Sequence, residues 1–185
     1  EILLDLFEEN ALDTQTVKRL FVLFRDMDME QQAITIMNKY LESNQDDTDA
    51  WLELADIYIQ KQNFTKALFC LEEQVAHAPR NYLVNLRYAE CLYSAARSSD
   101  SLADLQLARK YFSHAAILKE KPCVRALFGL VTTCSQIEKL LAANRKLEDS
   151  KNAQVMQTAK KQLRQVYATE ATGKIKQIAD MPLIQ

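Results

Sequence analysis

Hydrophobic side chains recur along most of this chain at intervals of three and four residues, the period of an amphipathic α-helix. The stretch AWLELADIYIQKQNFTKALFCLEE, residues 50–73, shows the pattern most clearly. Its first half places apolar positions on one helical face, and a second apolar face begins after the polar turn QKQNF. The pattern predicts two consecutive helices that pack through their apolar faces.

The same stretch follows a 34-residue helix–turn–helix pattern: W-x2-L-G-x2-Y in the first helix, A-x3-F in the second, and a closing proline. Ala replaces the glycine, and Leu replaces the phenylalanine of the second helix, which are small changes in packing volume. Small side chains let the two helices approach closely. We therefore interpret as structural the matching residues Trp51, Leu54, Ala55, Tyr58, Ala67, Leu71 and Pro79.

The unit recurs along the chain. Ala33 lies 34 residues before Ala67, and Ala108 takes the equivalent place in the following unit, displaced by about seven residues. We interpret the displacement as an inserted loop near 96–106. We expect one all-α solenoid domain of antiparallel helix pairs over 1–185. Its parts are a truncated second helix (1–12), a repeat (14–47), the best-matching repeat (48–81), a repeat with the inserted loop (82–122), a divergent helix pair (123–170) and a C-terminal cap or tail (171–185).

Composition narrows the function classes. Two glycines and three prolines are too few for a β-sandwich or for a glycine-rich phosphate loop. The sequence contains no run of 18 apolar residues, so it predicts no membrane-spanning helix. Four cysteines without a CxxC motif predict buried free thiols rather than a metal site, and His77 and His114 lack neighbours that would build a catalytic triad. We expect no catalytic residues, no metal and no cofactor.

Charge is unevenly distributed along the chain. Residues 1–74 hold 16 acidic and 6 basic side chains, whereas residues 75–185 hold 9 acidic and 17 basic ones. This asymmetry favours two chemically different partner surfaces or two solvated faces. The basic region at 145–164 could face anionic lipid headgroups, an acidic partner surface or solvent. Nucleic acid is not expected as a partner, because aromatic residues are not interleaved with the cations.

The repeat resembles the tetratricopeptide family. The segments AWLELADIYI, KALFCLEE, YAECLY, LARKYFSHA and RALFGL, in this order, resemble more closely the tetratricopeptide-repeat subunit 2 family of the endoplasmic reticulum membrane protein complex. The resemblance is densest over residues 50–130. It implies a right-handed solenoid and a fragment that covers the C-terminal two-thirds of such a subunit, because the chain opens inside an amphipathic pattern without Met.

The resemblance also implies a function. Members of that family are non-catalytic scaffolds on the cytoplasmic side of the endoplasmic reticulum membrane. They are peripheral subunits of a hetero-oligomeric membrane insertase, which inserts tail-anchored and multi-pass proteins. They bind cytosolic segments of the membrane subunits and a soluble partner subunit.

In solenoids of this kind the first helix of each pair lines the concave face, beside its packing stripe. Such a face would present apolar positions with acidic spots, which suits a segment with hydrophobic anchors and basic residues. The alternative is that several of these residues pack against the next helical turn. The candidate partner-binding residues are Leu52, Asp56, Ile59, Leu83, Leu86, Glu90, Tyr93 and Leu127.

An alternative function within the same fold class is a cochaperone or adaptor that binds peptides of cytosolic chaperones. Such domains hold a C-terminal carboxylate with a clamp of basic and amide side chains. Lys18 and Arg87 occupy two suitable places, but Val22, Glu53 and Leu83 stand where polar or basic side chains would be required.

Overall fold

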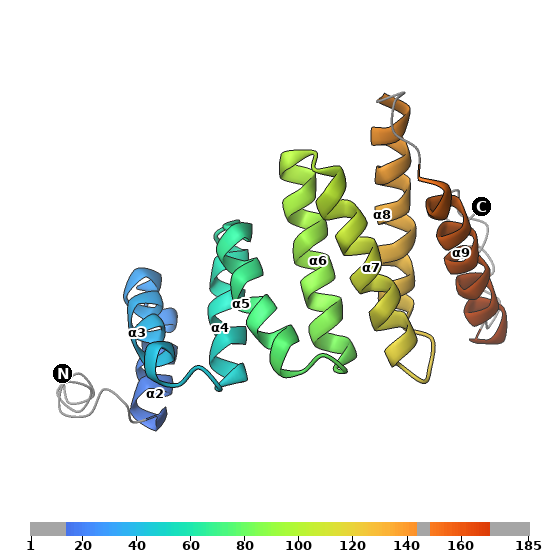
Figure 1. The fold of residues 1–185 in the computed structure, drawn as a ribbon. Coiled ribbons are helices and arrows are strands. Elements are labelled where there is room, and N and C mark those ends of the chain that lie inside the picture. Colours follow the sequence, from blue (N-terminus) through green and yellow to red (C-terminus); the bar gives the residue numbers. More distant parts are fainter. Residues whose placement is uncertain (1–13, 144–148, 171–185) are drawn as a thin grey trace. The chain divides into compact units, whose positions relative to one another are not determined.

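The described part of the protein is built of α-helices (Figure 1). A computed structural model describes residues 14–143 and 149–170, and the predicted truncated helix (1–12) and cap (171–185) lie outside these ranges. The helices are α2 (Thr14–Asp26), α3 (Glu30–Ser43), α4 (Thr48–Gln60), α5 (Phe64–His77), α6 (Tyr82–Ser99), α7 (Leu102–Leu118), α8 (Val124–Ala143) and α9 (Ser150–Glu170).

Contacts within the chain define two compact units, where the sequence predicts one continuous domain. The first unit is Glu1–His77 and holds α2 to α5, and the second is Ala78–Gln185 and holds α6 to α9. Within each unit, every helix packs against the next one along the chain. Each unit therefore has a core of its own.

In the first unit, small side chains allow the helices of a pair to approach closely. Ala55 on α4 and Ala67 on α5 are both fully buried, and Leu54 and Leu71 fill the space beside them. The turn between the two helices places Gln62 in the left-handed region, with φ of 57°. The helix α5 ends at His77, two residues before the exposed Pro79. This proline contributes little to the core, and its place just after the helix fits a residue that cannot continue a helix.

Asp47 joins three helices of the first unit. As the N-cap of α4, its Oδ1 accepts a hydrogen bond of 3.1 Å from the backbone amide of Ala50. Its Oδ2 lies 2.9 Å from Nζ of Lys18 on α2 and accepts a 2.9 Å bond from the hydroxyl of Tyr40 on α3. Burial alone would raise the pKa of Asp47, but these three hydrogen bonds outweigh it and lower the pKa. The ionised carboxylate therefore holds the start of α4 to both preceding helices.

The second unit corrects the prediction of an inserted loop near 96–106. The helix α6 continues to Ser99 and α7 begins at Leu102, so the extra residues lengthen both helices. Asp100 ends α6 in the left-handed conformation, with φ of 50°, and Ser101 caps α7 by accepting from the amide of Asp104. Both helices are extended because the added turns bury apolar side chains: Ala96 and Leu105 form an apolar cluster with Ile137 of α8.

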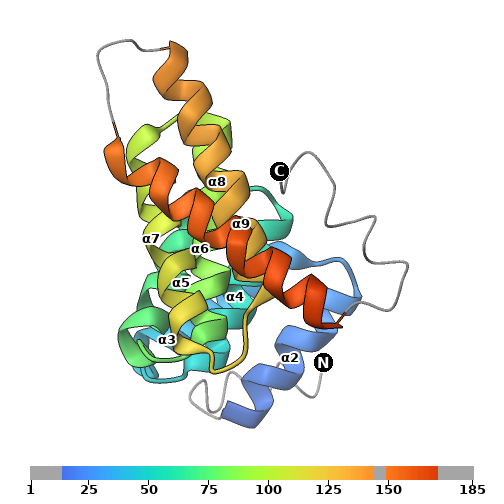
Figure 2. The same cartoon turned by 90° about the vertical axis from the view of Figure 1, so that its right-hand side faces the viewer.

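A buried polar cluster fixes the start of α9 to α7 and α8, and Figure 2 shows the course of these three helices. Asn152, only 2% exposed, donates to the carbonyl of Cys134 at 2.9 Å and accepts from Arg109 at 2.9 Å. The same Arg109 nitrogen lies 2.9 Å from Asp149, which also accepts from Gln106. Burial would raise the pKa of Asp149, but the pairing with Arg109 outweighs it and lowers the pKa. Each polar group in this cluster has a partner, so its burial is tolerated.

Helices α7 and α8 approach each other closely at Gly129. A Cβ atom at this position would overlap the ring of Phe112, which is 2% exposed on α7. The ring lies against the bare backbone of α8 and has little room to move, since protein interiors are closely packed. A glycine in the middle of a helix usually costs about 1 kcal/mol relative to alanine. Here the contact with Phe112 explains why a glycine occupies position 129.

We therefore expect Gly129→Ala to destabilise the protein by about 1–3 kcal/mol despite the higher helix propensity of alanine, because the added methyl group overpacks the interface. Urea unfolding followed by circular dichroism measures the change. The double variant Gly129→Ala with Phe112→Leu should lose less than the sum of the two single changes. Ser135→Ala, on the same helix, serves as the control. A more stable Gly129→Ala protein would contradict the packing described.

Candidate docking groove between α3, α4 and α5

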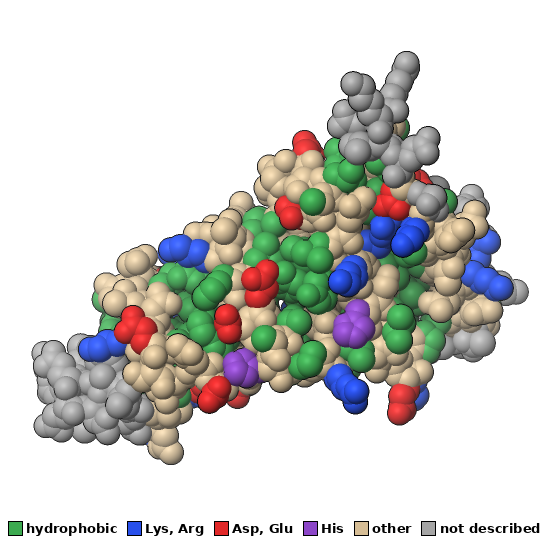
Figure 3. Space-filling view, in the orientation of Figure 1, with side chains coloured by type: hydrophobic (Ala, Val, Ile, Leu, Met, Phe, Trp, Pro, Cys, Tyr) green, Lys and Arg blue, Asp and Glu red, His purple; other side chains and the backbone are tan. Residues whose placement is uncertain are grey.

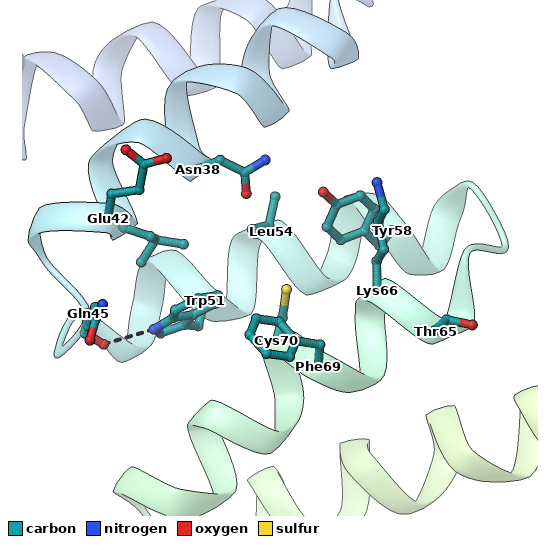
Figure 4. A pocket seen from close by; sticks show the side chains of 11 residues that line it. Asn38, Glu42, Gln45, Trp51, Leu54, Tyr58, Thr65, Lys66, Phe69 and Cys70 are labelled. Carbon is teal, nitrogen blue, oxygen red and sulfur yellow. Dashed lines mark hydrogen bonds between the residues drawn. The ribbon is translucent and has the colours of Figure 1, made fainter.

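The first unit has an open groove with α4 as its floor. Helices α3 and α5 each pack against α4 but have at most marginal contact with each other, which leaves part of α4 uncovered. The groove has a volume of about 620 Å³. Figure 4 shows side chains from all three helices converging on it. Its lining residues are Asn38, Leu41, Glu42, Gln45, Trp51, Leu54, Tyr58, Thr65, Lys66, Phe69 and Cys70.

Two aromatic rings form one end of the groove. The ring of Trp51 meets that of Phe69 edge to face, with centroids 5.9 Å apart. The indole nitrogen of Trp51 donates a 2.8 Å hydrogen bond to the carbonyl of Gln45, so the larger ring is fixed in place (Figure 4). Phe69 is 56% exposed, which is a large exposure for a phenylalanine in a hollow. A fixed Trp beside an exposed Phe is typical of a binding hot spot.

The groove changes the interpretation of the repeat stripe. The sequence predicts Trp51 as a packing residue, but its side chain is only half-buried and faces the groove, whereas Leu54 and Tyr58 are buried. Phe69 was not among the predicted site residues. A signal for it exists, because Phe69 lies between Ala67 and Leu71 and therefore off the packing face of α5.

Two of the eight predicted partner-binding residues are not on the surface. Leu86 is 2% exposed and Leu127 is 1% exposed, so both belong to the hydrophobic core and their prediction is corrected. Their apolar side chains contribute to the core of the second unit. The buried fraction of a helical stripe depends on later helices, which the position within one repeat does not reveal.

The other six predicted residues retain some exposure. Leu83 is 50% exposed, and Leu52, Asp56 and Ile59 on α4 are half-buried. Glu90 forms two hydrogen bonds with the guanidinium of Arg125 on α8, at 2.5 and 2.7 Å, and Tyr93 packs against the cluster of Ala96, Leu105 and Ile137. Glu90 and Tyr93 therefore have partners within their own unit. The binding role of these six residues stays a prediction.

The predicted stripe and the groove lie on different sides of α4. At 100° per residue, Leu52, Asp56 and Ile59 point roughly 130° away from the stripe of Trp51, Leu54 and Tyr58. A partner bound to Leu52, Asp56 and Ile59 would therefore leave the groove open.

Glu53 is an unusual carboxylate on α4. Its Oε2 atom is buried and has no hydrogen-bond partner among the described residues. Burial raises the pKa of Glu53, and the charges of Arg25 and Lys18 on α2 offset this effect only in part. Lys18 is already bound to Asp47, and this bond is the largest contribution to its raised pKa. Lys18 is therefore not available as half of a carboxylate clamp.

Two of the buried cysteines are not activated as nucleophiles. All four cysteines are buried free thiols, and burial raises the pKa values of Cys91 and Cys134 to about 11, which disfavours the reactive thiolate. His114 lies 3.2 Å from the side-chain oxygen of Asn85. Within the described ranges, no cluster of His, Cys, Asp and Glu could hold a metal ion. None of the helices in these ranges is long and apolar enough to cross a bilayer.

Comparison with known proteins decides the family. The model of the EMC2 TPR-like repeat domain matches residues 2–105 of this chain. The chain belongs to the EMC2 TPR-like repeat family. ER membrane protein complex subunit 2-B of Xenopus laevis is 31% identical over 182 residues, which is 95% of this chain and 59% of the relative. The chain thus spans about three-fifths of the length of this EMC2 relative. TPR repeat protein oca3 of Schizosaccharomyces pombe is 28% identical over 132 residues, 71% of this chain and 46% of the relative.

Solved structures agree on the fold. MamA MSR-1 C2 superposes with a TM-score of 0.60 at 15% identity, over 89% of this chain and 84% of that one. YrrB, described as a TPR protein with an unusual peptide-binding site, superposes with a TM-score of 0.55 at 18% identity, over 100% and 96% of the two chains. At these identities the likeness shows the tetratricopeptide fold alone. The predicted all-α tetratricopeptide class and the EMC2 resemblance are confirmed.

The raised pKa of Glu53 gives a prediction with a defined sign. Because the folded pKa lies above the reference value of 4.5, the folded state binds the proton more tightly, and stability falls as pH rises from 4.5 through the folded pKa. We expect Glu53→Gln to raise the melting temperature at pH 7 by about 2–4 °C. The gain should shrink as pH falls below 4.5.

Thermal melts between pH 4 and pH 8 measure this effect. The control is Glu42→Gln, which changes an exposed carboxylate of the same unit and should alter melting little at any pH. A destabilised Glu53→Gln protein at pH 7 would mean that the carboxylate has a favourable partner in solution.

Proposed function

We propose that this chain is part of a non-catalytic scaffold subunit of the endoplasmic reticulum membrane protein complex. The observation that carries the proposal is the EMC2 family match over residues 2–105, extended by the 31% identity over 182 residues to the Xenopus laevis subunit. A tetratricopeptide solenoid offers surfaces between and beside helix pairs rather than an enclosed active site. The thiols with raised pKa values support a binding role over a catalytic one.

In this proposal the subunit lies on the cytoplasmic side of the membrane, as a peripheral protein. It binds cytosolic segments of the membrane subunits and a soluble partner subunit, and so supports the insertion of tail-anchored and multi-pass proteins. The half-buried residues Leu52, Asp56 and Ile59 and the exposed Leu83 remain candidates for these contacts. The basic side chains of α9, among them Lys160 and Lys161, could face lipid headgroups, an acidic partner or solvent.

The cochaperone alternative has less support. Its clamp would need Lys18 to bind a terminal carboxylate, but Lys18 is bound to Asp47 at 2.9 Å. Releasing Lys18 would also leave Asp47, the N-cap of α4, without its cationic partner. Nothing in the described residues favours the clamp over the scaffold.

The proposal is tested by purifying the tagged full-length protein from endoplasmic reticulum membranes in mild detergent, followed by mass spectrometry. We expect multi-spanning endoplasmic reticulum subunits in amounts near those of the tagged protein. Protease treatment of sealed vesicles should remove the tag without detergent, because the subunit faces the cytoplasm. Recovery of soluble chaperones alone would contradict the proposal, and a tag protected until detergent is added would contradict the cytoplasmic side.

A further inference from the structure

The groove between α3, α4 and α5, here called the Trp51–Phe69 groove, exposes aromatic surface to solvent. We define this groove by the eleven residues that line it, and Figure 3 shows hydrophobic side chains exposed over the region of α3 to α5, with acidic side chains beside them. Phe69 is 56% exposed although the rest of α5 buries its apolar stripe. Exposure of aromatic surface to water is unfavourable, and the free energy falls when a partner covers that surface.

The length of the groove fits a helix. Along its floor, Trp51 and Tyr58 are seven residues apart on α4, which corresponds to two helical turns or about 10 Å. A partner helix that presents apolar side chains at i, i+3 or i+4, and i+7 would span this distance. Because Leu54 and Tyr58 are buried beneath the surface, its apolar side chains would meet mainly the half-buried Trp51 and the exposed Phe69. The two walls, α3 and α5, provide the sides of such a helix-in-groove contact (Figure 4).

The charge of the groove selects the partner. At the Trp51 end, the exposed Glu42 has no ion-pair or hydrogen-bond partner among the described residues, whereas Lys66 at the other end lies over the ring of Tyr58, 5.5 Å from its centroid. The surrounding unit is acidic, with 11 Asp and Glu against 6 Lys and Arg between residues 14 and 77. The two charges of the groove lie at opposite ends, so the Trp51 end is negative and lies in an acidic unit, which complements a basic segment placed at that end.

The rim also offers unused polar groups. The side chains of Asn38 on α3, Gln45 in the α3–α4 connection and Thr65 on α5 are exposed and make no hydrogen bond among the described residues. Polar groups around an aromatic centre are the usual anatomy of a protein interface, in which the rim bonds to the partner while the centre is desolvated. The hydrogen bond between Trp51 and Gln45 holds the centre in place before binding, which lowers the entropic cost.

We propose that the Trp51–Phe69 groove binds a basic amphipathic helix of a partner protein, whose bulky apolar side chains pack on Trp51 and Phe69 and whose Lys or Arg pairs with Glu42. The inference rests on the proposed scaffold function for the source of this helix, which is a cytosolic segment of another subunit of the complex. The docking chemistry itself depends only on the groove. This site lies on a different side of α4 from Leu52, Asp56 and Ile59, so the two surfaces could bind different segments.

The chain offers a direct reporter, because Trp51 is its single tryptophan. The probe is a synthetic helical peptide with Leu at i, i+3, i+4 and i+7, Lys at the other positions and no aromatic residue. A matched peptide carries Glu in place of every Lys. We expect the Lys peptide to shift the emission of Trp51 to shorter wavelength in a saturable manner. The Glu peptide should bind at least about 10-fold more weakly, because like charges oppose it.

Two variants and one control make the test specific. Phe69→Ser should weaken binding of the Lys peptide about 10-fold or more, as expected of a hot-spot residue. Glu42→Lys should weaken the Lys peptide and strengthen the Glu peptide. Ile117→Ser changes an apolar side chain that is 80% exposed on α7 and should leave binding unchanged. All three side chains are exposed, so circular dichroism should show folded proteins.

Four results would overturn the inference. They are an unchanged Trp51 emission with the Lys peptide, a preference for the Glu peptide, equal losses in Phe69→Ser and Ile117→Ser, and an emission shift on raising the protein concentration alone that Phe69→Ser abolishes. The last result would make a second copy of this chain the occupant.

In cells, full-length protein with Phe69→Ser should lose a subunit that Ile117→Ser retains. Retention of every subunit by Phe69→Ser would refute the groove but leave the scaffold function intact. Failure of the unmodified protein to recover the complex would refute the scaffold function itself.

Discussion

The close approach of helices at small side chains is the constraint on which both units depend. Ala33, Ala67 and Ala108 are fully buried at equivalent places on the second helices of successive pairs. Because alanine has no atom beyond Cβ, neighbouring helices come near enough for Leu, Phe and Tyr to fill the remaining space. Gly129 takes the same device further, since there the ring of Phe112 rests on the backbone of α8. Larger residues at these points would separate the helices and open the core.

This constraint also explains what the sequence could predict. The alternation of small and large residues at fixed spacing is local, so the fold class and the central helix pair followed from residues 50–73 alone. The inserted loop was wrong for a related reason. A comparison with a 34-residue repeat shows only that extra residues are present. It does not show that Ala96 and Leu105 continue the apolar pattern of the two helices, which is the signal that the helices are longer. The bonds of Asp47, the N-cap of α4, to Lys18 and Tyr40 join three helices, so the pattern within one helix pair does not reveal them.

The binding surface was harder to predict, because exposure is a property of the assembled unit. Leu86 and Leu127 occupy positions in the repeat that the stripe assigns to a partner, yet the second unit buries both. Conversely, the groove exists because α3 and α5 leave part of α4 uncovered, and no residue within one repeat reports that gap. The Trp that marks the repeat motif has two roles here. It joins α4 to α5 through Phe69, and its ring forms one end of the groove.

The distribution of the buried thiols has a further consequence, for the way each unit opens. Cys70 lies in the first unit, whereas Cys91, Cys123 and Cys134 lie in the second, and all four are shielded from solvent. A thiol that reacts only when its surroundings unfold records local opening, and its modification rate gives the free energy of that event. The protein therefore carries native sensors in both halves. Alkylation would reveal whether the two units open together, as one cooperative solenoid, or separately.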